Sequence, residues 1–372
     1  MGKEIDHSLI LNRIYEKLLR NHSRFTVKYP HISGPKKEGE MLDYEPMENN
    51  LWTSSFFPGE MLLAYGATKD KAFLSDADAY LESFKNRLDK GIGISHDLGF
   101  LYSLTCVALH RLTGDTRAKE LSQKAADELF LRYNEKGRFI QAWGEMGKGD
   151  PYVRIIADTM LNLPLLYQSG ISKYVDAARE HAHTSARYIV RDDYSSFHTY
   201  LMDPVSGKAV EGRTHQGFRD SSTWARGQAW IVYGYAISYG YTGEHKFLEI
   251  SQKAADYFLE RLPADAVSYW DLTFSDEISD IRDTSAAAIL ASGLLELAGH
   301  LADEQIKKKY TDTANKIVKN LCAGYFYPDK NSPVLLTEGM YHRDNGSTGT
   351  VWGDYFFMEA LTKLAGSYVK FW

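Results

Sequence analysis

Two aspartates, Asp97 and Asp158, are the strongest candidates for chemistry in this sequence. Each stands at the start of an apolar run, in H-D-L-G-F-L-Y-S (96–103) and I-I-A-D-T-M-L-N (155–162). An aspartate in that place is first of all a helix N-cap, and for either residue alone that is the simpler interpretation. Apolar neighbours also raise the pKa of a carboxyl group, and two adjacent carboxylates push their pKa values apart. If the fold brings the two helix starts together, the pair predicts general acid–base catalysis on a sugar.

A second set of candidates lies in and after the longest predicted loop, residues 191–223. Loops of that length in compact proteins are usually functional or mobile. The loop contains His198 and Gln216, and the segment that follows contains Arg226 and Trp230. The last two are four residues apart and share a helix face, where a guanidinium and an indole would suit a carboxylate on a ring. The alternative is a surface arginine packed on a core tryptophan.

Motifs for other chemistry are missing from the sequence. It contains no H-x-x-x-H or acidic pair at metal-ligand spacing, no glycine-rich phosphate loop and no G-x-S-x-G nucleophile motif. Cys106 and Cys322 do not form a disulfide framework in a chain of 372 residues. We therefore predict no metal ion and no other cofactor.

Composition narrows the class of protein. The net charge of −6 argues against a nucleic-acid partner, although a local arginine could still bind a small anion. No apolar run approaches the ~18 residues of a membrane span, and the first fifteen residues lack the layout of a signal peptide. We expect a cytoplasmic protein that does not interact with membranes. The oligomeric state is left open.

The elements that must position these residues are helices in pairs. Helical periodicity dominates, and glycines at 66, 114, 170, 243 and 299 each end one helix shortly before the next begins. The predicted pairs are 56–65 with 72–88, 97–112 with 118–133, 158–167 with 173–190, 223–241 with 246–262, and 284–298 with 304–321. A first helix around residues 10–18 and a last one over 352–368 complete about twelve, and short extended pieces are expected near 197–202 and 268–274.

A polar, aromatic loop precedes the first helix of each pair. If six hairpins close into a ring, all of these loops gather at one mouth. We therefore predict an all-α, (α/α)6 toroid of six helical hairpins, with residues 1–372 forming a single catalytic domain. No proline- or glycine-rich linker indicates a domain boundary.

Several runs of this sequence resemble the unsaturated glucuronyl hydrolases of glycoside hydrolase family 88. The runs include H-D-L-G-F-L-Y-S (96–103), I-I-A-D-T-M-L-N-L-P-L-L (155–166), T-H-Q-G-F-R-D-S-S-T-W-A-R-G-Q-A-W (214–230) and W-G-D-Y-F-F-M-E-A-L (352–361). The resemblance covers nearly the whole chain and implies the same toroid. It also implies an unusual hydrolase, which hydrates the C4=C5 bond of a Δ4,5-unsaturated uronic acid at the non-reducing end of lyase-generated oligosaccharides.

The same resemblance implies roles for individual residues. Asp158 would protonate C4 and activate water, and Asp97 would be its partner in the site. The residues implied to bind the substrate are His198, Gln216, Arg226, Trp230, Trp52, Trp143 and His96. The implied partner is an unsaturated oligosaccharide, most of all a glycosaminoglycan-type disaccharide.

One segment departs from the family. Members that prefer sulfated substrates carry serines and a lysine shortly before W-G-D-Y, whereas residues 343–350 here contain no lysine. Arg343 and Ser347 are therefore only possible contacts for a sulfate or for the leaving sugar. The alternatives that stay open are an unsaturated rhamnogalacturonyl hydrolase, a non-catalytic glycan-binding toroid, and an epimerase using His198 and His215.

Overall fold

The structure is a computed structural model that describes residues 6–35, 38–146, 148 and 151–372. The first five residues of the segment searched for a targeting signal lie outside this part. Its long helices are α1 (His7–Asn21), α2 (Phe56–Thr68), α3 (Ala77–Asp89), α6 (Thr116–Phe130), α8 (Ser172–Tyr188), α9 (Ala225–Thr242), α10 (His245–Leu259), α11 (Thr284–Gly299), α12 (Glu304–Asn320) and α13 (Val351–Leu364). The shorter ones are α4 (Leu98–Tyr102), α5 (Ala108–Thr113) and α7 (Pro164–Tyr167), and a π-helical turn, Ser103–Val107, joins α4 to α5.

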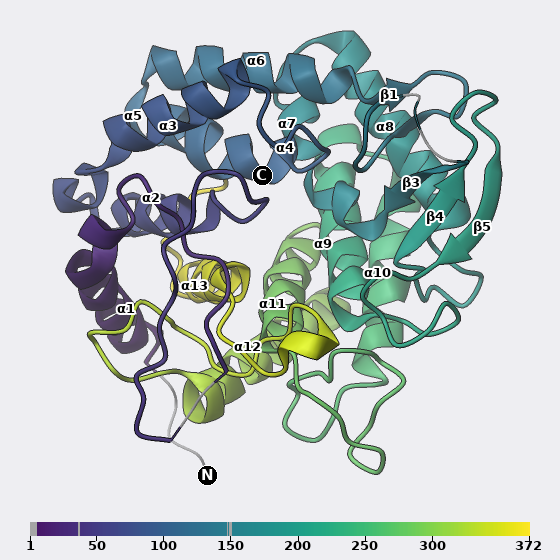
Figure 1. Cartoon of the computed structure of the whole chain (residues 1–372). Coiled ribbons are helices and arrows are strands. Elements are labelled where there is room, and N and C mark those ends of the chain that lie inside the picture. The colour runs from purple at the N-terminus through teal and green to yellow at the C-terminus, as the bar shows by residue number, and fades with distance from the viewer. Residues whose placement is uncertain (1–5, 36–37, 147, 149–150) are drawn as a thin grey trace.

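These helices form two concentric rings, which Figure 1 shows around a common centre. The inner ring consists of α2, α4 with α5, α7, α9, α11 and α13, and each packs against its neighbours until α13 meets α2. The outer ring consists of α1, α3, α6, α8, α10 and α12. The predicted (α/α)6 toroid is thus confirmed, with α13 and α1, from opposite ends of the chain, forming its sixth pair.

The ring that a helix occupies follows from its sequence. Helix α9 is hydrophobic on all sides, and its residues 225–238 are all buried. Helix α12 carries one apolar stripe, and only Tyr310, Ala314, Ile317 and Val318 are buried. A helix that is apolar all round must be covered on every side, whereas an amphipathic helix can face water.

The prediction of one continuous helix over residues 158–167 was wrong. A 3-10 helix over Ala157–Leu161 is followed by a separate short helix, α7, that begins at Pro164. Proline has no backbone N–H to donate and clashes with the preceding turn, so it starts a helix rather than continuing one. The break leaves Asp158 on a tight turn instead of a regular helix.

Two small antiparallel sheets stand beside the rings. One pairs β1 (Tyr133–Asn134) with β2 (Phe139–Ile140), and the other has the order β3 (Val153–Ile156), β4 (Thr199–Met202), β5 (Ala209–Arg213). Strand β4 lies within the predicted extended piece 197–202, and residues 268–274 form only isolated bridges. Strands β1, β2, β3 and β5 were not predicted, because short strands depend on partners elsewhere in the chain.

Of the helices in the described ranges, none has the length and apolar character needed to cross a membrane.

Candidate active site

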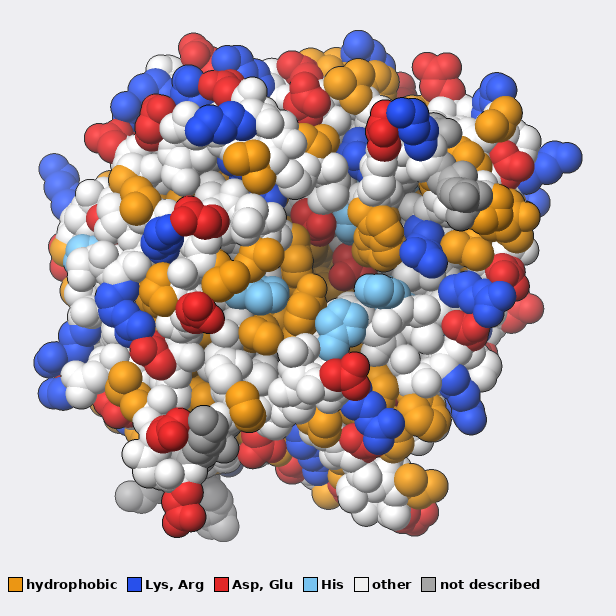
Figure 2. All heavy atoms as spheres, viewed as in Figure 1, with side chains coloured by type: hydrophobic (Ala, Val, Ile, Leu, Met, Phe, Trp, Pro, Cys, Tyr) orange, Lys and Arg blue, Asp and Glu red, His pale blue; other side chains and the backbone are white. Residues whose placement is uncertain are grey.

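A cavity of about 350 Å³ opens where the loops before the inner helices meet. Its lining consists of Trp52, His96, Asp97, Trp143, Arg154, Ile156, Asp158, His198, His215, Gln216, Tyr341 and His342. Figure 2 shows a hollow at the centre of this face, with acidic side chains inside it and histidines at its edge. The volume is within the range of small-molecule sites. Loops before the first four inner helices reach the cavity as predicted, and Tyr341 and His342 reach it from the connection before α13. The loop before α11 contributes none of these lining residues.

A very close contact brings the two aspartates to the same cavity. A Cβ atom added to Gly99 would lie 2.3 Å from the Cα atom and the carbonyl oxygen of Asn162, so only glycine allows α4 to approach this turn. Asn162 Oδ1 accepts a hydrogen bond from the Phe100 N–H at 2.6 Å, and its Nδ2 donates to the Asp158 carbonyl oxygen at 3.2 Å. Asn162 therefore holds the helix start that carries Asp97 against the turn that carries Asp158.

Asp158 is largely buried and does not act as a helix cap. Its side chain is 14% exposed, and Oδ2 has no hydrogen-bond partner among the described residues. Burial raises the pKa of Asp158 to about 7; the Arg226 guanidinium opposes this rise and the charge of Asp97 adds to it. A carboxyl group in that state can hold and deliver a proton near neutral pH.

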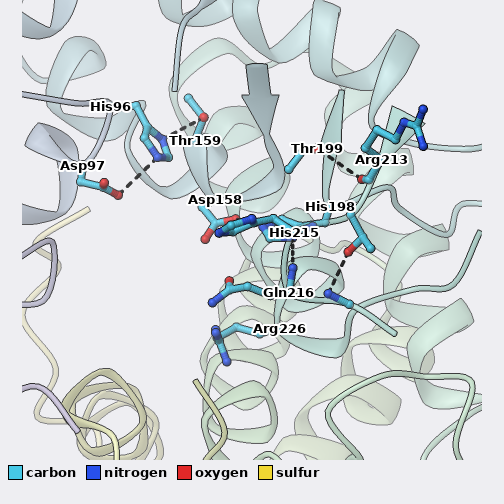
Figure 3. Close-up of polar contacts among 12 residues, drawn as sticks. His96, Asp97, Asp158, Thr159, His198, Thr199, Arg213, His215, Gln216 and Arg226 are labelled. Carbon is cyan, nitrogen blue, oxygen red and sulfur yellow. Dashed lines mark hydrogen bonds and ion pairs between the residues drawn. The ribbon is translucent and has the colours of Figure 1, made fainter. Parts of the chain in front are cut away.

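Asp97 has a more polar setting. It occupies the cap position of α4 but does not cap it; its Oδ2 accepts a hydrogen bond from the Ser95 hydroxyl at 2.8 Å. His96 Nε2 lies 3.4 Å from Asp97 Oδ1, and the Nδ1 atom of that ring contacts Thr159 Oγ1 at 3.0 Å (Figure 3). The two acids therefore differ in environment, as a division of roles between them requires.

His198 faces Asp158 because strands β3 and β4 pair. The last pair in this register is Ile156 with Thr199, and the Ala157 N–H donates to the His198 carbonyl oxygen at 3.0 Å. His198 Nε2 then lies 3.8 Å from Asp158 Oδ2. The backbone N–H groups of His215 and Gln216 both donate to His198 Nδ1, each at 3.1 Å, so Nδ1 carries no proton and Nε2 does.

We expect His198 to stay neutral, with its proton on Nε2, from pH 5 to pH 8. Burial lowers the pKa of His198 well below its usual value, and the neighbouring His215 and the Arg226 guanidinium lower it further. Nitrogen-15 NMR of histidine-labelled protein would show an unprotonated Nδ1 and no titration in that range. The His198→Gln variant assigns the signal, and a charged imidazolium at pH 6 would contradict the expectation.

Arg226 and Trp230 lie beneath the cavity and are not among its lining residues. Trp230 is fully buried and packs against Phe100 and Phe356, with ring centroids 5.4 and 5.3 Å apart. Arg226 is 1% exposed and forms an ion pair with Asp283 at 3.0 Å. Both side chains are buried below the cavity, next to Asp158, so the predicted contact of the guanidinium and the indole with a substrate ring stays a prediction.

Arg226 also supports part of the cavity wall. It donates hydrogen bonds to the backbone carbonyl oxygens of Met340 and, at 3.3 Å, Tyr341. Gln216, which lines the cavity, donates to the same Tyr341 oxygen at 3.1 Å. These bonds fix the segment that presents Tyr341 and His342 to the cavity.

The other predicted residues divide by position. Trp52 and Trp143 both line the cavity, and Trp52 packs on Trp352 with ring centroids 5.1 Å apart. Arg343 and Ser347 do not line it; Arg343 is exposed and lies 3.2 Å from the carboxylate of Asp280. The sulfate or leaving-sugar contact suggested for Arg343 and Ser347 stays a prediction.

Five lining residues were not among the predicted site residues: Arg154, Ile156, His215, Tyr341 and His342. His215 had been named only for the epimerase alternative. Arg154 and Ile156 alternate on β3, so a period of two just before Asp158 was a usable signal. No sequence signal identified Tyr341 and His342, because their segment is held at the cavity by hydrogen bonds from Arg226 and Gln216, which are distant in the sequence.

Comparisons with known proteins give one consistent answer. The sequence profile of Glycosyl Hydrolase Family 88 matches residues 30–365. An unsaturated chondroitin disaccharide hydrolase of Streptococcus pneumoniae is 40% identical over 342 residues, which cover 88% of this chain and 85% of that protein. An unsaturated glucuronyl hydrolase of Bacillus sp. (strain GL1) is 39% identical over 363 residues, 95% of each chain.

Similarity in three dimensions extends over the same length. The crystal structure of the unsaturated glucuronyl hydrolase from Streptococcus agalactiae superposes with a TM-score of 0.93 at 36% sequence identity. The match covers 100% of this chain and 95% of that one.

Proposed function

The chain belongs to glycosyl hydrolase family 88, and from that premise we propose that it is an unsaturated glucuronyl hydrolase. It removes the Δ4,5-unsaturated uronic acid from the non-reducing end of lyase-generated glycosaminoglycan disaccharides. The proposed partner is therefore an unsaturated oligosaccharide. The observation that carries this proposal is the buried Asp158, whose pKa is raised to about 7 beside a second aspartate in a sugar-sized cavity.

The proposed reaction is hydration rather than direct displacement at the glycosidic carbon. Asp158 gives its proton to C4, water adds its oxygen to C5, and the other proton of that water returns to the Asp158 carboxylate. The hemiketal at C5 opens to a ketone, and the resulting hemiacetal at C1 releases the leaving sugar as an alcohol. One water molecule is consumed, and the enzyme ends in the protonation state in which it began.

We assign the surrounding residues by position. The Nε2–H group of His198 faces Asp158 and is suited to hold its carboxylate or the water while a proton moves. Asp97 and His96 bind ring hydroxyl groups. Trp52, Trp143 and Gln216 form the walls around the sugar. Arg226 contributes through its charge and through the segment that it supports.

The test of this function is a panel of unsaturated disaccharides from chondroitin, hyaluronan, heparin and gellan. Hydration removes the conjugated double bond, so turnover appears as a loss of ultraviolet absorbance. We expect turnover of glycosaminoglycan disaccharides. Binding without turnover of every disaccharide would favour a glycan-binding toroid instead.

The rate should fall as pH rises through about 7. Burial raises the pKa of Asp158 to that value, and only the protonated form can deliver a proton to C4. We expect kcat/KM to be level well below pH 7 and to decrease about tenfold per pH unit well above it. A pH–rate profile on one disaccharide measures this, with circular dichroism at each pH as the control for folding. A rate that increased above pH 8 would contradict the assignment of Asp158 as the acid.

We also infer that residues 1–372 act as a single catalytic domain, which the pairing of α13 with α1 supports. Limited proteolysis that released two separately folded halves would contradict it. The cytoplasmic location stays a prediction from the sequence.

A further inference from the structure

The cavity has an inner end and a rim with different chemistry. The inner end holds Asp97 and Asp158 with their histidines. At the rim, Trp143 and His215 lie with ring centroids 5.7 Å apart, and His215 and His342 with centroids 5.5 Å apart. Arg154 joins this rim, with its guanidinium carbon 5.7 Å from the centre of the Trp143 ring.

The backbone of β3 places Arg154 two residues before Ile156, farther along the strand from the two aspartates. Arg154 and Ile156 share a face of β3, and both line the cavity, with Ile156 next to the turn that carries Asp158. On the other edge of β3, the Ala142 N–H donates to the Arg154 carbonyl oxygen at 2.8 Å. That bond fixes Trp143, the next residue, beside the Arg154 side chain.

Arg154 carries a positive charge that the described part of the chain does not neutralise. None of the described carboxylates lies within ion-pair distance of its guanidinium, and that group has no hydrogen-bond partner among the described residues. Burial lowers the pKa of both His215 and His342, so the two rings are neutral at pH 7. Among the lining residues described here, Arg154 is therefore the fixed cation.

The orientation of the bound substrate determines which of its groups lies next to the Arg154 guanidinium. On the proposed function, the unsaturated uronic acid is the terminal residue and must reach the inner acids. The sugar that is released then lies toward the rim, against Trp143, whose indole can cover a sugar face. A guanidinium beside that sugar matches the oxygens of a sulfate ester in geometry and charge.

We propose that Arg154, held against Trp143, binds a sulfate ester on the leaving sugar and makes this chain selective for sulfated disaccharides. The proposal rests on the proposed function and names the substrate class within it. Arg154 then binds the sulfate from β3, in a chain that has no lysine between residues 343 and 350. Arg343 fits this role less well, because it is outside the lining and is paired with Asp280.

The experiment compares two chondroitin disaccharides that differ only in one sulfate on the leaving sugar. For Arg154→Met, which keeps the aliphatic stem, we expect the ratio of kcat/KM for the sulfated over the unsulfated substrate to fall roughly 10- to 100-fold. Arg154→Lys should keep part of the preference, because it retains the charge and loses the planar fork. The matched control is Arg213→Met on β5 of the same sheet, whose guanidinium is already paired with Glu211 and Asp220, and it should leave the ratio unchanged.

Each other outcome is informative. An equal loss on both disaccharides would overturn the proposal and indicate that Arg154 binds the uronate carboxylate. An unchanged ratio in Arg154→Met, or a drop in Arg343→Met alone, would overturn it as well. If the wild-type protein turned over the unsulfated chondroitin disaccharide at least as well as the sulfated one, the proposal would fall while the proposed function stood. If it turned over no disaccharide of the whole panel, the proposed function itself would fall, and the proposal with it.

Discussion

Replacing Asp158 by asparagine is expected to reduce turnover of unsaturated disaccharides by at least about 10³-fold while the fold is retained. Asparagine has nearly the same shape but cannot give a proton to C4 or take one from water. The Oδ2 atom is buried and accepts no hydrogen bond from the described residues, so the exchange breaks no observed bond at that atom. The measurement is the loss of ultraviolet absorbance, with substrate binding followed separately by calorimetry.

Stability distinguishes a lost acid from a damaged fold. Because burial raises the pKa of folded Asp158 to about 7, its ionisation destabilises the folded wild-type protein increasingly as pH rises from about 4 to about 7. The Asp158→Asn variant should therefore be at least as stable as the wild type at pH 8, by up to ~4 kcal/mol in urea unfolding. Asp303→Asn is the control, since Asp303 is an exposed aspartate that does cap its helix. Near-normal activity of Asp158→Asn would remove Asp158 from the mechanism.

Replacing Asp283 by alanine is expected to lower the free energy of unfolding by about 3–5 kcal/mol. Asp283 is fully buried and accepts hydrogen bonds from Arg226, from the N–H and hydroxyl of Ser285, and from the Met340 N–H. Its removal leaves the charge of Arg226 buried without its counter-ion. Urea unfolding at pH 7 measures the loss.

Asp283 also caps the N-terminus of α11, and two comparisons separate the effect of the buried charge from the loss of that cap. Asp303→Ala removes an exposed cap and should lower stability by only about 1 kcal/mol. The double variant Asp283→Ala, Arg226→Met should be less destabilised than the sum of the two single variants, because no unpaired charge remains. Equal losses for Asp283→Ala and Asp303→Ala would show that the ion pair contributes little. Activity should fall in Asp283→Ala as well, since Arg226 supports the segment that carries Tyr341.

The plan of the fold was predictable because its signals are local. Hydrophobic periodicity separates an inner helix such as α9 from an outer one such as α12. Gly114 and Gly243 end their helices as predicted, whereas Gly66 lies inside α2, which ends at Thr68. The break before α7 also had a local signal in Pro164, which the predicted helix over 158–167 did not use. Strands β3 and β5 had weaker signals, since short strands depend on partners elsewhere in the chain.

The sequence by itself determined the two helix-start aspartates, their apolar neighbours and the family motifs, because each is a property of adjacent residues. Only the tertiary structure decided that neither aspartate caps its helix, that Trp230 is core, and that Arg226 is paired with Asp283 while Arg154 is left without a described carboxylate. The physical reason is that burial, ion pairing and pKa depend on groups that approach from distant parts of the chain. Asp158 shows this most clearly: its type and neighbours are written in the sequence, whereas its raised pKa arises from burial in the closed ring and from the charge of Asp97, against the opposing charge of Arg226.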